Sequence, residues 1–228
     1  MQMPKINDLL ELGAHFGHKK EFSHPKAQEY VYLTSEGVDI IDLEKTIICL
    51  ENAIKYLQQM HLQKKSVVFV GTKRQIKEII KETAQACDMP YVTSRWLGGT
   101  FTNFETIKKR ISNYKELKNK IQTEKLDDYT KKEKLELEKK VAKLSKFFLG
   151  LENLDKLPDA MLIIDPKEEK VALKEAKKMN IPVIAVCNTN IDVSQIDYPI
   201  MVNDNSSKTI KYICDIIINT LKDNNTKK

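Results

Sequence analysis

The sequence predicts an α/β fold, in which a parallel β-sheet is flanked by helices and carries an inserted antiparallel coiled-coil hairpin. Short runs rich in Val and Ile alternate with amphipathic helical stretches over most of the chain, and this alternation is typical of parallel sheets with right-handed crossovers. One interval, between residues 93 and 160, is far longer than a crossover helix requires. The 228 residues, 41% of them apolar, suffice for a substantial core.

The N-terminal part predicts a β-hairpin followed by a long helix. Residues 30–33 and 38–41 are two short β-prone runs separated by a four-residue turn that ends in Gly37. Asp42 then precedes a helical pattern over residues 43–61, and its side chain suits the N-cap of that helix.

The parallel sheet is predicted from apolar runs with little alternation, which are typical of strands buried on both faces. These runs are residues 66–71, 90–93, 160–165 and 182–187, with a weaker fifth at 198–202. Helices are predicted over residues 74–87, 168–179 and 206–221. Their expected buried residues are Ile76, Ile79, Ile80, Ala84, Val171, Ala172, Ala176, Ile210, Ile213, Ile217 and Leu221.

The long interval divides the chain into a globular domain, residues 1–102 and 149–228, and an inserted hairpin, residues 103–148. Within the insertion, apolar residues recur at about heptad spacing on each side of a polar stretch at 123–129. Two antiparallel helices packed through these residues would form a protruding coiled coil with its lysines outward. The apolar residues are Ile107, Ile111, Tyr114, Ile121, Leu137, Val141, Leu144 and Phe148.

The positive charge of the chain is concentrated in this insertion. Residues 103–148 hold fourteen Lys and Arg against eight Asp and Glu, an excess equal to the net charge of +6 of the whole chain. An excess confined to one segment favours a binding surface for a polyanion. A solvated helical face is the alternative.

The cysteines and apolar runs indicate a soluble, intracellular protein. Cys49, Cys87, Cys187 and Cys214 are scattered and form no C-x-x-C pair, so they predict buried single thiols in a reducing compartment. Neither a secretory signal nor a membrane-spanning run is evident.

The segment at residues 95–104 combines Arg95, the chain's single Trp96, two glycines and two phenylalanines. Paired glycines allow a bend or a close approach, and an arginine beside aromatic rings is suited to nucleic acid. Trp96 could equally fill a core at a structural turn.

Two predicted strand ends carry charged residues that could take part in catalysis or phosphate binding. Lys73 and Arg74 follow Gly71 and Thr72 at a predicted strand end, where we expect phosphate contacts, although neither a Walker A nor a G-x-G-x-x-G motif occurs. Cations in the first turn of a helix are disfavoured by its dipole and need another reason. Asp165, before a proline, is predicted to cap a turn or helix.

Two histidines and two lysines near the N-terminus form another candidate site. A helix would place His15 and His18 on one side, as metal ligands can be, but a third ligand cannot be named from the sequence. Lys19 and Lys20 follow at once and favour phosphate or RNA, while a turn stabilised by the histidines is the alternative. No catalytic triad or dyad can be assembled, so we expect no enzyme, metal or cofactor.

Several segments together resemble one family, the bacterial-type small-ribosomal-subunit protein two. They follow the family's order and span nearly the whole chain, which makes the joint match specific. The segments are residues 14–18, 40–46, 69–73, 95–99 with 102–103, 130–133, 157–160 with 164–165, and 181–185 with 189–190.

The resemblance implies a flavodoxin-like sheet with a projecting coiled-coil hairpin, in a non-enzymatic protein of the small ribosomal subunit. It implies binding to 16S-type ribosomal RNA, contact with neighbouring proteins and recruitment of the messenger-binding ribosomal protein one. Such a protein would lie in cytoplasmic ribosomes, or in an organelle stroma or matrix. Arg95 and Trp96 would anchor the loop at the hairpin base.

The RNA-binding residues expected from the resemblance and from the residue patterns are His15, His18, Lys19, Lys20, Lys73, Arg74, Arg95, Trp96, Lys108, Lys109 and Arg110. Two other functions remain open. One is an α/β enzyme that holds a phosphorylated metabolite between residues 71–74 and 188–192. The other is an RNA-binding scaffold outside the ribosome.

Overall fold

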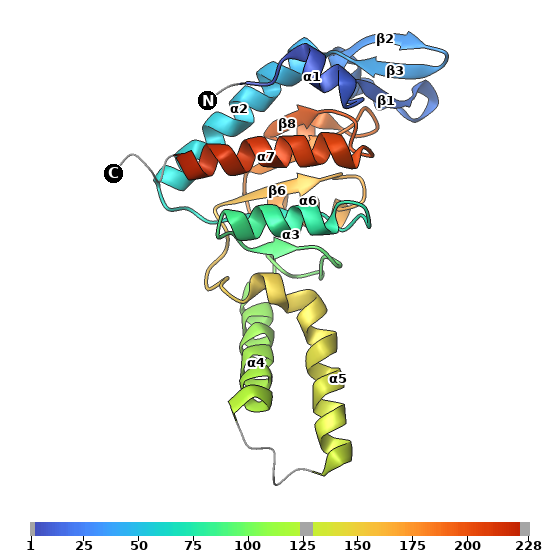
Figure 1. Cartoon of the computed structure of the whole chain (residues 1–228). Helices are drawn as coiled ribbons and strands as arrows, with labels where there is room; N and C mark the ends of the chain where they lie inside the picture. The colour runs from blue at the N-terminus through green and yellow to red at the C-terminus, as the bar shows by residue number, and fades with distance from the viewer. Residues whose placement is uncertain (1–2, 124–129, 224–228) are drawn as a thin grey trace.

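The computed structural model describes residues 3–123 and 130–223 and contains two sheets and a projecting helix pair (Figure 1). The strands are β1 (Phe16–Lys19), β2 (Val31–Ser35), β3 (Val38–Ile41), β4 (Val67–Val70), β5 (Tyr91–Val92), β6 (Ala160–Ile164), β7 (Val183–Cys187) and β8 (Tyr198–Met201). The α-helices are α1 (Ile6–Glu11), α2 (Leu43–Leu62), α3 (Lys77–Ala86), α4 (Phe104–Thr123), α5 (Lys131–Phe148), α6 (Lys170–Lys178) and α7 (Ser207–Asp223).

The larger sheet is parallel, as predicted, with the strand order β5-β4-β6-β7-β8. Numbered along the chain from β4, this is 2-1-3-4-5, one of the two common orders of doubly wound sheets. Every residue of β4, β6 and β7 is buried, because helices cover both faces. The five predicted strands are therefore all present.

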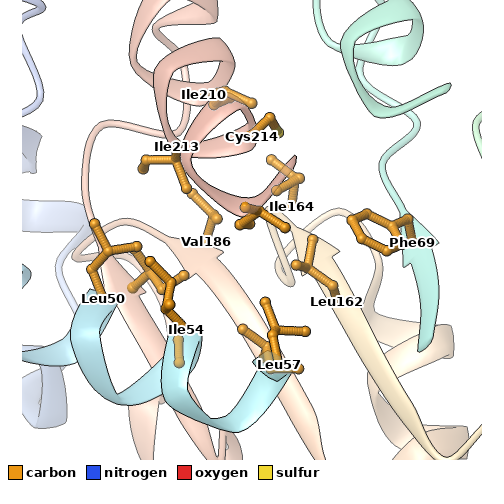
Figure 2. Close-up of a cluster of buried hydrophobic side chains, with 14 of the residues drawn as sticks. Leu50, Ile54, Leu57, Phe69, Leu162, Ile164, Val186, Ile210, Ile213 and Cys214 are labelled. Carbon is orange, nitrogen blue, oxygen red and sulfur yellow. The ribbon is translucent and has the colours of Figure 1, made fainter. Parts of the chain in front are cut away.

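Alternate strand residues enter two separate cores. On one face, α2, α3 and α7 cover residues such as Phe69, Leu162 and Val186, and Figure 2 shows these side chains in the same buried cluster as Leu50 and Ile213. On the other face, α6 and the base of the α4–α5 pair cover a second cluster. Burial of this kind contributes roughly 25 cal/mol per Å² of apolar surface.

The predicted N-terminal hairpin is confirmed as β2 and β3, but the small sheet has a third strand. β1 pairs antiparallel with β3 and completes the order β1-β3-β2. Residues 16–19 therefore do not form the helix considered for the two histidines. Asp42 caps α2 as predicted, since its Oδ1 accepts a hydrogen bond from the Glu44 N–H at 3.0 Å.

The insertion forms two antiparallel helices, α4 and α5, that project from the sheet (Figure 1). Ile107, Ile111, Tyr114 and Phe148 are buried at its base, as the heptad spacing predicts. Most of the polar stretch at 123–129 lies outside the described residues.

Two helical details differ from prediction. Helix α3 begins at Lys77 rather than at residue 74, so Lys73 and Arg74 lie in the turn before it and not in its first turn. In α6, Val171 is 53% exposed, whereas Glu175 is buried. The inward side of α6 thus includes a carboxylate that an apolar pattern cannot reveal.

Candidate nucleic-acid interface

The loop before α4 is bound to α6 through the single carboxylate of Glu175. Its Oε1 accepts hydrogen bonds from the Gly99 N–H at 2.7 Å and from Trp96 Nε1 at 3.3 Å. Its Oε2 accepts from the N–H groups of Phe101 at 2.9 Å and Thr102 at 3.2 Å, and from the Thr102 hydroxyl at 3.3 Å. We call this set of contacts the Glu175 clamp, and it fixes the base of the helix pair on the sheet.

The clamp depends on an ionised carboxylate. Burial alone would raise the pKa of Glu175, but the backbone hydrogen bonds from Phe101, Gly99 and Thr102, with that from Trp96, lower it below the ordinary value. Gly99 adopts a φ of +90° in the loop, a conformation that side chains disfavour. Glycine at this position therefore lets three N–H groups converge on one carboxylate.

Trp96 and Arg95 are neighbours in the sequence, but Trp96 is buried and Arg95 is exposed. The Trp96 ring is 6% exposed and meets Phe101 edge to face, with 4.8 Å between ring centroids. Its faces are therefore occupied by protein, which agrees with the core alternative considered for this residue. Arg95 is exposed and remains accessible to a partner.

The cations on α4 are exposed. Lys108, Lys109 and Arg110 lie just after Ile107 and just before Ile111, the two buried residues that pack α4 at its base. None of the three forms an ion pair with a described carboxylate, whereas Lys118 nearby binds Glu152 at 2.7 Å. Their charges are thus directed to solvent or to a partner.

Lys73 is instead held inside the protein. Its Nζ lies 2.5 Å from Asp165 Oδ2 and 3.2 Å from Asp204 Oδ2, and it donates to Asn205 Oδ1 at 2.9 Å. Burial lowers the pKa of Lys73, but the two carboxylates outweigh this effect and raise it. This lysine therefore holds three segments together at the sheet edge, while Arg74 is exposed.

The same edge holds Asp165, which the sequence predicts to be a cap, and a second acid, Glu169. Asp165 caps a turn as predicted, because its Oδ1 accepts from the Lys167 N–H at 3.1 Å. The neighbouring loop is also occupied, since Glu169 Oε1 accepts from the Thr72 N–H at 3.2 Å and from its hydroxyl at 2.5 Å. Within the segment considered for phosphate, Thr72 and Lys73 are thus bound to the protein's own carboxylates, whereas Arg74 is exposed.

The N-terminal histidines lie at the junction between the two sheets. His18 Nε2 lies 3.0 Å from Asn190 Nδ2, and the His18 N–H donates to the Thr189 hydroxyl at 3.0 Å. Burial lowers the pKa of His15, which favours its neutral form. Lys19 and Lys20 are exposed beside them.

The described part of the chain offers no metal centre and no membrane helix. No group of three or more His, Cys, Asp or Glu within residues 3–123 and 130–223 is placed to bind a metal ion. Among the described helices, none combines the length and apolarity needed to cross a bilayer.

Sequence reasoning missed two residues that organise these sites. Glu175 lies in α6 three residues after Ala172, and Asp204 lies in the loop before α7. Both are acids in helical or polar surroundings, where charge normally indicates exposure.

The chain was compared with known proteins. The family described as ribosomal protein S2 matches residues 9–224. The small ribosomal subunit protein uS2 of Fusobacterium nucleatum is 42% identical, and the match covers 99% of this chain and 92% of that protein. The protein of the same name from Petrotoga mobilis is 41% identical, with 93% and 74% covered.

The match runs through both cores, the clamped loop and the helix pair, and so covers nearly all of the described fold. It agrees with the family expected from the ordered segments of the sequence. The chain belongs to the ribosomal protein S2 family, whose members are ribosomal proteins and not enzymes.

Proposed function

We propose that this protein is a structural component of the small ribosomal subunit that binds its 16S-type RNA through the α4–α5 pair and the adjoining Arg95. The observation that carries the proposal is the contrast in charge pairing. Lys108, Lys109 and Arg110 are exposed and unpaired among the described residues, while the cation at the sheet edge is neutralised internally. Unpaired cations on a projecting element suit a polyanion.

The shape of the helix pair supports the same function. Its two helices contact each other and share one buried apolar cluster at the base, and its root is held by the Glu175 clamp. A rigid, elongated basic element can follow the RNA backbone and contribute phosphate contacts without reading bases. Sequence discrimination would then come from RNA shape and from unpaired bases.

We also propose that the protein helps to recruit the messenger-binding ribosomal protein one. The small sheet offers an apolar surface for a protein partner, because Phe16 and Leu33 flank Ile40 on one side of it and are 48% and 45% exposed. Replacing Phe16 and Leu33 by Ser should leave this protein in the subunit while lowering the amount of ribosomal protein one that sediments with it. Unchanged occupancy would contradict the recruitment role.

Sedimentation of the tagged full chain in cell extract tests the main proposal. On sucrose gradients at moderate and high salt, we expect the protein to migrate with small subunits. Absence from subunit and ribosome fractions at both salt concentrations would overturn the ribosomal function and favour a scaffold outside the ribosome.

The salt dependence of RNA binding tests the mechanism. Each neutralised phosphate should add roughly 0.7 to 0.9 to the slope of log affinity against log salt. Binding of a small-subunit RNA transcript should therefore weaken steeply between low and physiological salt. Affinity that stays constant over this range would exclude phosphate contacts as its source.

A further inference from the structure

A second group of lysines surrounds a cavity of about 250 Å³ between the start of α6 and the loop after β7. Apolar residues, polar side chains and three lysines share its lining. The lining consists of Pro166, Lys167, Lys170, Leu173, Lys174, Asn190, Ile191, Asp192 and Gln195. We call this cavity the lysine pocket.

The three lysines approach the pocket from one side. Lys170 and Lys174 are four residues apart on α6 and therefore lie on one face of the helix, and Lys167 precedes Lys170 by three residues. All three are exposed, and none forms an ion pair with a described carboxylate. By contrast, Lys177 in the last turn of the same helix lies 3.7 Å from Asp197.

The position of these cations opposes the helix dipole. Lys170 is the first residue of α6, where the positive end of the dipole disfavours further positive charge. Three like charges around one small cavity also repel one another. An anion in the pocket would relieve both effects.

The acid in the pocket wall does not supply that anion. Asp192 accepts hydrogen bonds from the Ser194 hydroxyl at 2.6 Å and from Gln195 Nε2 at 3.3 Å, and its Oδ2 lies 3.2 Å from Lys26 Nζ. These contacts, led by that of Ser194, lower the pKa of Asp192. Its charge is therefore paired with Lys26, which does not line the pocket.

The pocket lies on the same face of the sheet as the helix pair. Leu173, which lines the pocket, packs in one core cluster with Trp96 and Ile107. Two residues after Leu173 on α6, Glu175 binds the loop that leads into α4. The opposite wall is held by the contact between Asn190 and His18, which connects the pocket to the exposed Lys19 and Lys20.

We propose that the lysine pocket binds a phosphodiester group of ribosomal RNA together with its adjoining sugar. Its basic side matches the phosphate, and its apolar floor of Pro166, Leu173 and Ile191 matches the face of a ribose. This inference rests on the proposed RNA-binding function and adds a contact on the globular domain, separate from the α4 cations. One RNA would then follow a basic path from the helix pair across α6.

A charge-matched comparison tests the pocket. The pocket variant carries Lys167→Gln, Lys170→Gln and Lys174→Gln, and the control carries Lys64→Gln, Lys208→Gln and Lys211→Gln, three exposed lysines outside the pocket. Each full-length variant is titrated with a labelled small-subunit RNA transcript over a range of salt. We expect about tenfold weaker binding for the pocket variant, less than twofold for the control, and a slope reduced by roughly 0.7 to 0.9, as for the loss of one phosphate contact.

A loss no larger than that of the control would overturn the inference. If Lys108→Gln, Lys109→Gln and Arg110→Gln still weaken binding in that case, the proposed function stands and only the pocket contact fails. If wild-type protein does not bind the transcript at all, both proposals fail. Circular dichroism and thermal melts verify that every variant is folded.

A small phosphate compound is the other source of the same chemistry. Sodium phosphate and sodium chloride are therefore compared as competitors of the RNA at equal ionic strength. An RNA phosphodiester site predicts equal displacement by the two salts. Selective displacement by low-millimolar phosphate, lost in the pocket variant, would instead identify a site for a free anion and overturn the RNA assignment.

Discussion

The sheet edge and the helix pair use lysine in opposite ways. At the edge, Lys73 is 16% exposed and lies between two buried carboxylates, Asp165 and Asp204. On α4, Lys108 and Lys109 are exposed and lack a described carboxylate partner. The comparison shows that accessibility and charge pairing, rather than residue type, separate a lysine that stabilises the fold from one whose charge is free to meet a partner.

The strongest test of this comparison replaces the paired cation. Lys73→Met would leave two buried carboxylates without their partner, and we expect it to lower the free energy of unfolding by about 3 kcal/mol. Urea unfolding of the full chain measures the change. Because Lys73 is turned inward, RNA affinity of the folded variant should fall less than twofold.

Lys81→Met provides the control, since Lys81 pairs with Glu78 at 3.3 Å on the surface. Exposed pairs contribute at most about 1 kcal/mol. If Lys73→Met were as stable as this control but bound RNA much more weakly, Lys73 would belong to the binding surface and the distinction drawn here would be wrong.

Removing the charge of the clamp should have the next largest effect. Glu175→Gln keeps the size of the side chain but replaces one acceptor oxygen by an NH₂ group that faces N–H donors. We therefore expect a loss of about 2 kcal/mol in unfolding free energy. A variant as stable as wild type would show that the loop is held by packing alone.

The same variant makes the pH dependence testable. Because folding lowers the pKa of Glu175 from its ordinary value of 4.5, its contribution is complete above pH 4.5 and is lost as the pH falls through the lower pKa of the folded protein. The stability difference between wild type and Glu175→Gln should therefore be largest near pH 7 and shrink below pH 4.5. A difference that grows in acid would have the wrong sign.

Replacing the unpaired cations of α4 should weaken RNA binding and leave stability nearly unchanged, the opposite of the effect expected for Lys73. Lys108→Gln, Lys109→Gln and Arg110→Gln together should weaken RNA binding about tenfold, or about 1.4 kcal/mol. Unfolding free energy should change by less than about 0.5 kcal/mol, as for other exposed positions. A clear loss of stability without loss of RNA affinity would mean that these exposed cations stabilise the fold and do not bind RNA.

Much of the architecture could be predicted because it depends on local patterns. Val- and Ile-rich runs such as residues 160–165 and 182–187 have few structures open to them other than buried strands. The heptad spacing of Ile107, Ile111 and Tyr114 likewise predicts one buried seam. These features are repeated along the sequence, so one irregular residue does not hide them.

The long-range polar contacts could not be predicted. Glu175 meets the N–H of Phe101, 74 residues away, and Lys73 meets Asp204, 131 residues away. Nothing in the neighbouring sequence distinguishes these residues from exposed charges. The start of α3 lies three residues later than predicted, because residues 74–76 form a turn that is closed by the Ile76 N–H bond to the Lys73 carbonyl.

The smallest expected effect concerns Trp96, whose role the sequence left open. Trp96→Phe keeps most of the buried ring and its contact with Phe101 but removes the hydrogen bond to Glu175. We expect a loss of about 1 kcal/mol in unfolding free energy and no change in RNA affinity or in its salt slope. Stacking of a base on this ring is worth roughly 1–3 kcal/mol, so a clear fall in affinity at unchanged stability would mean that the loop opens and presents Trp96 to RNA. Unchanged affinity would place the boundary between structural and binding residues between Arg95 and Trp96.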